Sequence, residues 1–132
     1  MIEINGAAHF VLTVSQFDAA KDFYCELLPF FGLQKVYEGN NFIYHVGGRT
    51  AIGIQRCAPE YEGERFMQNR VGLHHACLRT RSRKDVDAVA KKLKEMGAFI
   101  HRVRRPRWYP SGGELRARQG PAHRRRTHDL KQ

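Results

Sequence analysis

Short stretches of alternating hydrophobic and polar residues are separated by one longer stretch with helical spacing in the first half of the chain. The alternation predicts strands over residues 9–14, 33–37, 42–46 and 50–56, because successive side chains of a strand point to opposite faces. Gly47-Gly48 favours a tight hairpin between the last two. A helix is predicted after Ser15, ending near Gly32, from the apolar stripe Phe17, Ala20, Tyr24 and Leu27.

The second half repeats this pattern. Residues 73–80 are predicted to form a strand, a helix follows Ser82 and ends near Gly97, and residues 99–103 begin another strand. In each copy a histidine lies in the first strand, and a serine with an aspartate three residues later is expected to cap the helix. The histidines are 66 residues apart, the serines 67 and the glycines 65. Two further strands expected by symmetry are missing from the sequence.

The net charge of +10 is concentrated in the last part of the chain. Residues 1–100 hold 13 Lys/Arg and 11 Asp/Glu, whereas residues 101–132 hold 10 and 2. Residues 104–132 are rich in Arg, Gly and Pro, and such a tail is expected to be poorly ordered. Non-specific binding of polyanions is the expected property of the tail, because the chain has no motif for specific recognition of nucleic acid.

Composition excludes several classes of protein. No stretch approaches the length of a membrane span, and the first residues lack the pattern of a signal peptide. The three cysteines are odd in number and form no C-x-x-C pair, which favours free thiols in a reducing cytoplasm. A cytoplasmic location is therefore expected.

The two half-chains resemble the modules of the vicinal oxygen chelate superfamily. The first carries Ala8-His9-Phe10-Val11-Leu12-Thr13-Val14, Phe23-Tyr24 and Phe31-Gly32-Leu33; the second carries Leu73-His74-His75-Ala76-Cys77-Leu78, Asp85-Val86-Asp87 and Met96-Gly97-Ala98. This superfamily includes glyoxalase I, extradiol dioxygenases and the fosfomycin- and bleomycin-resistance proteins. The resemblance implies an α+β fold in which paired βαβββ modules form a curled mixed sheet around a cleft. The modules would cover about residues 4–57 and 71–103 of a 1–103 domain, with the second apparently incomplete.

The resemblance also implies a divalent metal ion held by the first and last strands of each module. His9 and His75 are the expected ligands, with Gln55 as a further candidate; His75 is preferred to His74 because a strand would turn the two side chains to opposite faces. Zn, Ni, Mn and Fe are not distinguishable. His45 is interpreted as a surface or cleft-lining residue, and the aromatic residues of the first helix and its end as core or interface packing: Phe23, Tyr24, Phe30 and Phe31.

The fourth metal ligand of the superfamily is where this chain departs from the pattern. Members place a glutamate on the last strand, usually after an Asp-Pro-x-Gly turn, and neither feature is present. Glu114 and Asp129 are the late carboxylates that could replace it. No catalytic base is identified, and a frameshifted or recombined gene end is one hypothesis for the Arg-rich segment.

Three functions follow as alternatives. The leading one is a divalent-metal-dependent enzyme acting on a small molecule with vicinal oxygens, by lyase, isomerase or dioxygenase chemistry. A metal-free protein that binds an antibiotic or another small molecule is the second, and an inactive truncated relative with a basic tail is the third. A homodimer is expected in each case, because incomplete closure of the second module leaves sheet edges exposed.

Overall fold

The computed structural model describes residues 1–100, which fall in two units, Met1–Met67 and a second that begins at Gln68. The basic segment 104–132, together with Glu114 and Asp129, lies outside the described residues, and so do residues 101–103 of the last expected strand.

The first unit has the order of elements that the hydrophobic pattern predicts. Strand β1 (His9–Val14) leads into helix α1 (Phe17–Phe30), and β2 (Gln34–Glu38), β3 (Phe42–Val46) and β4 (Ala51–Arg56) follow. A single turn of 3-10 helix, η1 (Pro59–Tyr61), comes after β4. The βαβββ module is therefore confirmed, with strand ends within one residue of those expected.

The four strands form one mixed sheet in the order β1-β4-β3-β2. The first and last strands of the module, β1 and β4, are parallel, with His9 beside Ala51 and Thr13 beside Gln55. The other two pairs are antiparallel, and a bulge between Lys35 and Tyr37 shifts the register of β2. This arrangement places the β1 and β4 side chains next to each other, with β1 at one edge of the sheet.

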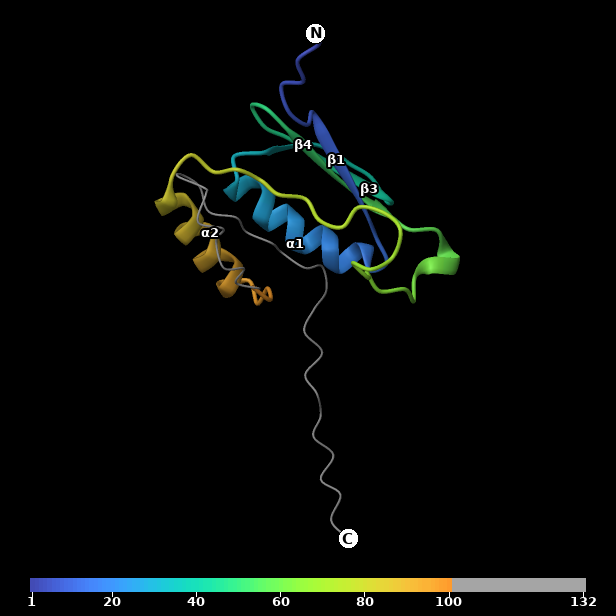
Figure 1. The fold of residues 1–132 in the computed structure, drawn as a ribbon. Helices are drawn as coiled ribbons and strands as arrows, with labels where there is room; N and C mark the ends of the chain where they lie inside the picture. The colour runs from blue at the N-terminus through green and yellow to red at the C-terminus, as the bar shows by residue number, and fades with distance from the viewer. Residues whose placement is uncertain (101–132) are drawn as a thin grey trace. The chain divides into compact units, whose positions relative to one another are not determined.

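Helix α1 lies along one face of the sheet (Figure 1). The core between them is made by apolar side chains of both layers that are at most 6% exposed: Val14, Phe17, Leu27, Leu28, Leu33, Ile43, Ile52 and Ile54. The helix can lie here because Phe17 and Leu27 recur at helical spacing and form its apolar stripe. The helix ends at Phe30, and Gly32 just beyond it has a φ of 78°, the left-handed conformation that glycine adopts readily.

The start of α1 differs from the expectation. Gln16, not Ser15, is the N-cap residue, and no side chain caps the helix. Asp18 does not reach back to the chain before it but pairs with Arg56 of β4, with 3.0 Å between Oδ1 and Nη2. The guanidinium of Arg56 also lies 4.7 Å from the centre of the Phe17 ring. Asp18 was therefore wrongly predicted to act in a capping box.

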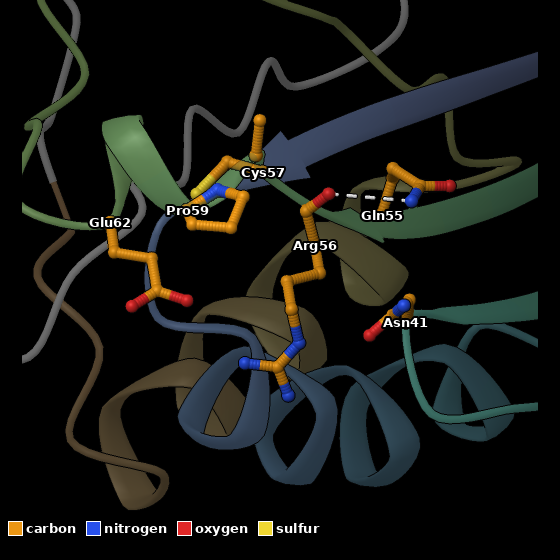
Figure 2. A pocket seen from close by; sticks show the side chains of 7 residues that line it. Asn41, Gln55, Arg56, Cys57, Pro59 and Glu62 are labelled. Atoms are coloured by element: carbon orange, nitrogen blue, oxygen red, sulfur yellow. Dashed lines mark hydrogen bonds between the residues drawn. The ribbon is translucent and has the colours of Figure 1, made fainter.

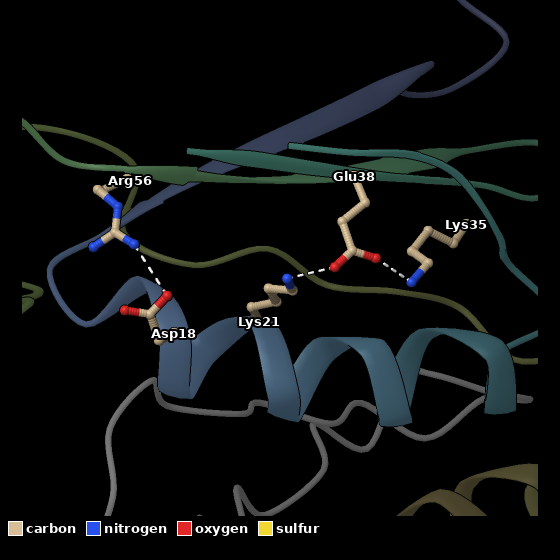
Figure 3. Close-up of polar contacts among 5 residues, drawn as sticks. All are labelled: Asp18, Lys21, Lys35, Glu38 and Arg56. Atoms are coloured by element: carbon tan, nitrogen blue, oxygen red, sulfur yellow. Dashed lines mark hydrogen bonds and ion pairs between the residues drawn. The ribbon is translucent and has the colours of Figure 1, made fainter. Parts of the chain in front are cut away.

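Two sets of ion pairs join α1 to the sheet (Figure 3). Besides Asp18 and Arg56, Glu38 of β2 accepts hydrogen bonds from both Lys21 of α1 and its strand neighbour Lys35. The Lys21 ammonium, and then that of Lys35, lowers the pKa of the Glu38 carboxyl to about 2. The hydrogen bond to Glu38 raises the pKa of each lysine. Glu38 is thus held in its charged form wherever the module is folded at neutral pH.

The described part of the second unit contains helix α2 (Arg83–Glu95). Its N-terminus has the predicted capping box, since the Asp85 amide donates to the Ser82 hydroxyl and the Ser82 amide donates to the Asp85 carboxylate. Its C-terminus repeats that of α1, because Gly97 has a φ of 73° and the next amide bonds back to Leu93, as the Leu33 amide does to Leu28. The sequence repeat therefore reflects a structural repeat at both helix ends.

The strand expected over Leu73–Thr80 does not form; these residues have no regular secondary structure. A strand depends on hydrogen bonds to a neighbouring strand, and the sequence lacks the two further strands that would complete the second module. The α+β class is confirmed, and within residues 1–100 the second module is incomplete, as expected. No helix in residues 1–100 is long and apolar enough to cross a membrane.

Candidate functional site

The sheet face turned away from α1 carries the candidate chemistry of the first unit, and we call it the open face. Strand parity and register place on it alternate residues of all four strands: His9, Val11, Thr13, Gln34, Tyr37, Phe42, Tyr44, Val46, Ala51, Gly53 and Gln55. Within residues 1–67 no helix covers this face, and Val11, Tyr37 and Val46 are 47%, 56% and 38% exposed.

Three aromatic rings form a row across the open face. The Phe42 ring lies between those of Tyr37 and Tyr44, with centroid distances of 6.0 Å and 5.7 Å. The planes of Phe42 and Tyr44 are 25° apart, so these two rings are stacked. The row offers apolar ring surface together with two phenol hydroxyls, which suits an aromatic ligand with polar groups.

Gly53 lets the Phe42 ring lie against the sheet. A Cβ atom at Gly53 would stand 2.7 Å and 2.8 Å from two ring atoms of Phe42 and 3.2 Å from the Tyr44 ring. The first two distances are too short for real carbon contacts. A side chain at this position would therefore lift or displace the row.

The predicted ligands His9 and Gln55 are on the open face, as strand parity predicts, but they lie far apart along the direction of the strands. His9 pairs with Ala51 and Gln55 with Thr13, four residues further along the parallel strands. Four residues of strand span about 13 Å. Because ligands of one ion lie about 2.1 Å from it, these two side chains do not converge on a common ion. Gln55 instead donates from Nε2 to the Arg56 carbonyl oxygen at 3.3 Å.

His75 and His74 lie in the second unit and contact each other. Their Nδ1 atoms are 2.8 Å apart and both side chains are exposed. The parity argument that separated them assumed a strand, and residues 73–80 do not form one. The assignment of opposite faces to these neighbours was therefore wrong, while the role of His75 as a ligand stays a prediction.

The donors in residues 1–100 do not fit the metal centre that the resemblance implies. No three His, Cys, Asp or Glu side chains among them lie close enough to hold one ion. On the open face of the first unit, His9 is the single imidazole, and the positions level with it and next to it on β4 are Ala51 and Gly53. We therefore derive no chemical step through a metal ion.

His45 is not on the surface or in the cleft, contrary to the expectation. It is fully buried on the α1 face of the sheet, and neither ring nitrogen has a hydrogen-bond partner among the described residues. Burial away from water lowers its pKa, helped by the positive charge of Lys35 and opposed by Glu38. The parity of β3, which places Phe42 and Tyr44 on the open face, could have predicted this position.

A cavity of about 480 Å³ lies where β4 runs into η1 (Figure 2). It is lined by the residue before β3, the end of β4 and the segment that follows: Asn41, Gln55, Arg56, Cys57, Ala58, Pro59 and Glu62. Gln55 belongs both to this cavity and to the open face. It offers an amide group at the edge of the aromatic row, where a polar part of a ligand could be bound.

The aromatic row is the feature that sequence analysis missed. The aromatic residues singled out there lie on and after α1, where Phe23 and Tyr24 make an edge-to-face contact at 5.2 Å. The signal for the row was present in β3, where Phe42, Tyr44 and Val46 alternate with buried residues. What the pattern lacked was the β2–β3 pairing that brings Tyr37 beside them.

Comparison with known proteins decides the family. The sequence profile of the Glyoxalase/Bleomycin resistance protein/Dioxygenase superfamily matches residues 6–116. The chain belongs to this superfamily. The resemblance to vicinal oxygen chelate proteins is thereby confirmed. A comparison with curated proteins gave no match.

Solved structures of this superfamily share the fold at low sequence identity. A putative glyoxalase from Bacillus halodurans is 24% identical, with a TM-score of 0.65 over 73% of this chain and 72% of that protein. The fosfomycin resistance protein FosX from Listeria monocytogenes is 18% identical, with a TM-score of 0.60 over 89% and 84%. Lactoylglutathione lyase from Agrobacterium tumefaciens is 17% identical, with a TM-score of 0.55 over 84% and 90%. At these identities the likeness concerns the fold alone.

Proposed function

We propose that this chain is a small-molecule-binding member of the glyoxalase superfamily whose open face binds a planar organic ligand without requiring a metal ion. The observation that carries the proposal is the row of Tyr37, Phe42 and Tyr44 on a sheet face that no helix of residues 1–67 covers. The three rings provide contact area at little cost in conformational entropy, since each aromatic side chain has only two rotatable angles.

The chemistry of the open face favours neutral or cationic ligands over anionic ones. Its strand residues include no lysine, arginine, aspartate or glutamate, and their polar groups are His9, Thr13, Gln34, the two phenols and Gln55. The faces of aromatic rings attract cations and not anions. A planar molecule with polar or positively charged substituents therefore fits, and an antibiotic of the bleomycin kind is one such molecule.

Direct binding tests this proposal. Metal-free bleomycin, whose bithiazole is planar, is titrated calorimetrically into the full chain in the presence of EDTA, with fosfomycin, a small phosphonate without an aromatic part, as the matched comparison. Bleomycin is expected to bind with EDTA present and fosfomycin is not. Absence of bleomycin binding, or binding that appears only after a divalent ion is added, would contradict the proposal.

A second candidate is the metal-dependent enzyme, with His9 and His75 as ligands of a divalent ion. It is favoured by the exposure of both imidazole side chains. Here the chain's own residues would only bind the ion, because no general base is identified among those described. Metal analysis of protein purified without chelator, compared with the His9→Ala/His75→Ala double variant, decides it: equal metal content in both ends this candidate.

The partners expected from the sequence complete the proposal. A homodimer is supported by the two edge strands of the sheet, β1 and β2, each of which can accept a further strand. Sedimentation equilibrium measures the assembly directly.

Non-specific binding of polyanions is assigned to Arg124, Arg125 and Arg126, and their joint replacement by alanine should weaken retention on heparin. A cytoplasmic location stays a prediction.

A further inference from the structure

The two neighbouring imidazoles of His74 and His75 are the strongest unexplained feature of the described chain. Their Nδ1 atoms stand 2.8 Å apart and the ring centroids 5.0 Å apart, with the planes at 78°. Nitrogens at this distance cannot both present lone pairs to each other without a proton or a cation between them. In the metal-free chain one ring donates its Nδ1–H to the other.

We propose that His74 and His75 together chelate a divalent transition-metal ion through their two Nδ1 atoms. On binding, the ring that carries its proton on Nδ1 takes the other neutral tautomer, with the proton on Nε2, so no net proton is released. Both rings are exposed, so the rotation needed to turn the two lone pairs toward one ion meets no packed neighbour. Water would complete the coordination sphere.

The ligand type indicates the kind of ion. The 2.8 Å between the two Nδ1 atoms is a hydrogen-bond distance in the metal-free chain, and it changes when the rings turn toward an ion. Imidazole nitrogens suit Ni²⁺, Cu²⁺ and Zn²⁺, and the affinity of nitrogen ligands for divalent ions rises through Ni²⁺ to Cu²⁺. Ni²⁺ and Cu²⁺ are therefore expected to bind the pair.

The irregular conformation of residues 73–80 makes this pair possible. Neighbouring residues of a strand point to opposite faces, which would separate the two rings. Since no strand forms here, both side chains are brought to one side of the backbone. The proposed site lies wholly in the second unit and does not depend on the ligand-binding function proposed for the open face.

Nickel binding to single variants tests the site. Ni²⁺ is titrated calorimetrically into the full chain and into His74→Ala, His75→Ala and His9→Ala. We expect the affinity to fall about tenfold or more in the first two, because a second ligand on the same loop binds at high effective concentration, and to be unchanged in the third. Far-UV circular dichroism confirms folding, and His74→Gln and His75→Gln repeat the test with polar replacements.

Two results would overturn the proposal. Loss of affinity in His9→Ala and His75→Ala but not in His74→Ala would show that His75 pairs with His9 instead. Unchanged affinity in all three variants would place the ion on other residues. As a second measurement, paramagnetic Ni²⁺ at substoichiometric amounts should broaden the imidazole proton signals of both His74 and His75, and broadening of only one of them would refute chelation.

Discussion

Replacing His45 by leucine should stabilise the first unit and change its response to acid. The imidazole is fully buried and both of its nitrogens lack partners among the described residues. A buried polar group without a hydrogen bond costs about 1–3 kcal/mol. Leucine has a similar volume and no polar atom, so His45→Leu should gain about that amount at pH 7.5.

The pH dependence provides the sharper part of this prediction. Burial lowers the pKa of His45 in the folded state, so the unfolded chain binds the proton more readily. Above pH 6.5, the approximate pKa of His45 in the unfolded chain, this residue does not reduce the free energy of unfolding by taking up a proton. As the pH falls from there through the pKa of His45 in the folded state, the free energy of unfolding decreases. Where the unfolded chain is protonated and the folded one is not, the loss approaches about 1.4 kcal/mol per pH unit.

Urea unfolding at pH 7.5, 6.5 and 5.5, followed by tyrosine fluorescence, measures both effects. His9→Leu is the matched control, because His9 is an exposed histidine on a strand of the same sheet. We expect His45→Leu to reduce the loss of stability between pH 6.5 and 5.5, and His9→Leu to leave it unchanged. A His45→Leu protein that is less stable than the wild type at pH 7.5, or one that loses stability with pH as steeply, would refute the reasoning.

Three further perturbations test other parts of the fold. Ser82→Ala should destabilise α2 by about 0.5–2 kcal/mol through loss of its capping box, whereas Ser15→Ala, which removes no cap, should cost far less; equal effects in thermal unfolding would contradict the assigned caps. Gly53→Ala should displace the Phe42 ring and weaken bleomycin binding while leaving the far-UV spectrum unchanged, and unchanged affinity would contradict the contact. In the wild type, the free energy of unfolding should decrease as the pH falls from 4.5 toward 2, because the pKa of Glu38 is lowered to about 2 in the folded state. Glu38→Gln should remove this part of the decrease. An unaltered acid-unfolding curve would contradict the ion pairs.

The first unit was predictable because its signals are local. Alternation over five or six residues, the Gly47-Gly48 turn and the apolar stripe of α1 each specify an element without reference to distant parts of the chain. The capping box of α2 was predictable for the same reason. In α1 the same Ser and Asp spacing failed, because Asp18 finds a stronger partner in Arg56, 38 residues away in sequence.

The site was harder to predict because it depends on pairing between strands. Parity alone placed His9 and Gln55 on one face, but the register of β1 against β4 sets them four residues apart. The failure of residues 73–80 to form a strand has the same origin, since strand formation depends on partners that a local pattern does not contain. Because no strand forms there, the side chains of His74 and His75 contact each other instead of pointing to opposite faces.

The dissociation constant of metal-free bleomycin for Tyr44→Ala, measured in EDTA beside Tyr61→Ala, tests the central claim most directly. Tyr44 is the end ring of the row, whereas Tyr61 is an exposed tyrosine of η1, off the open face. Loss of one ring contact of about 1 kcal/mol corresponds to about fivefold weaker binding. We predict this loss for Tyr44→Ala and no change for Tyr61→Ala; equal affinities in the two variants would contradict ligand binding on the open face.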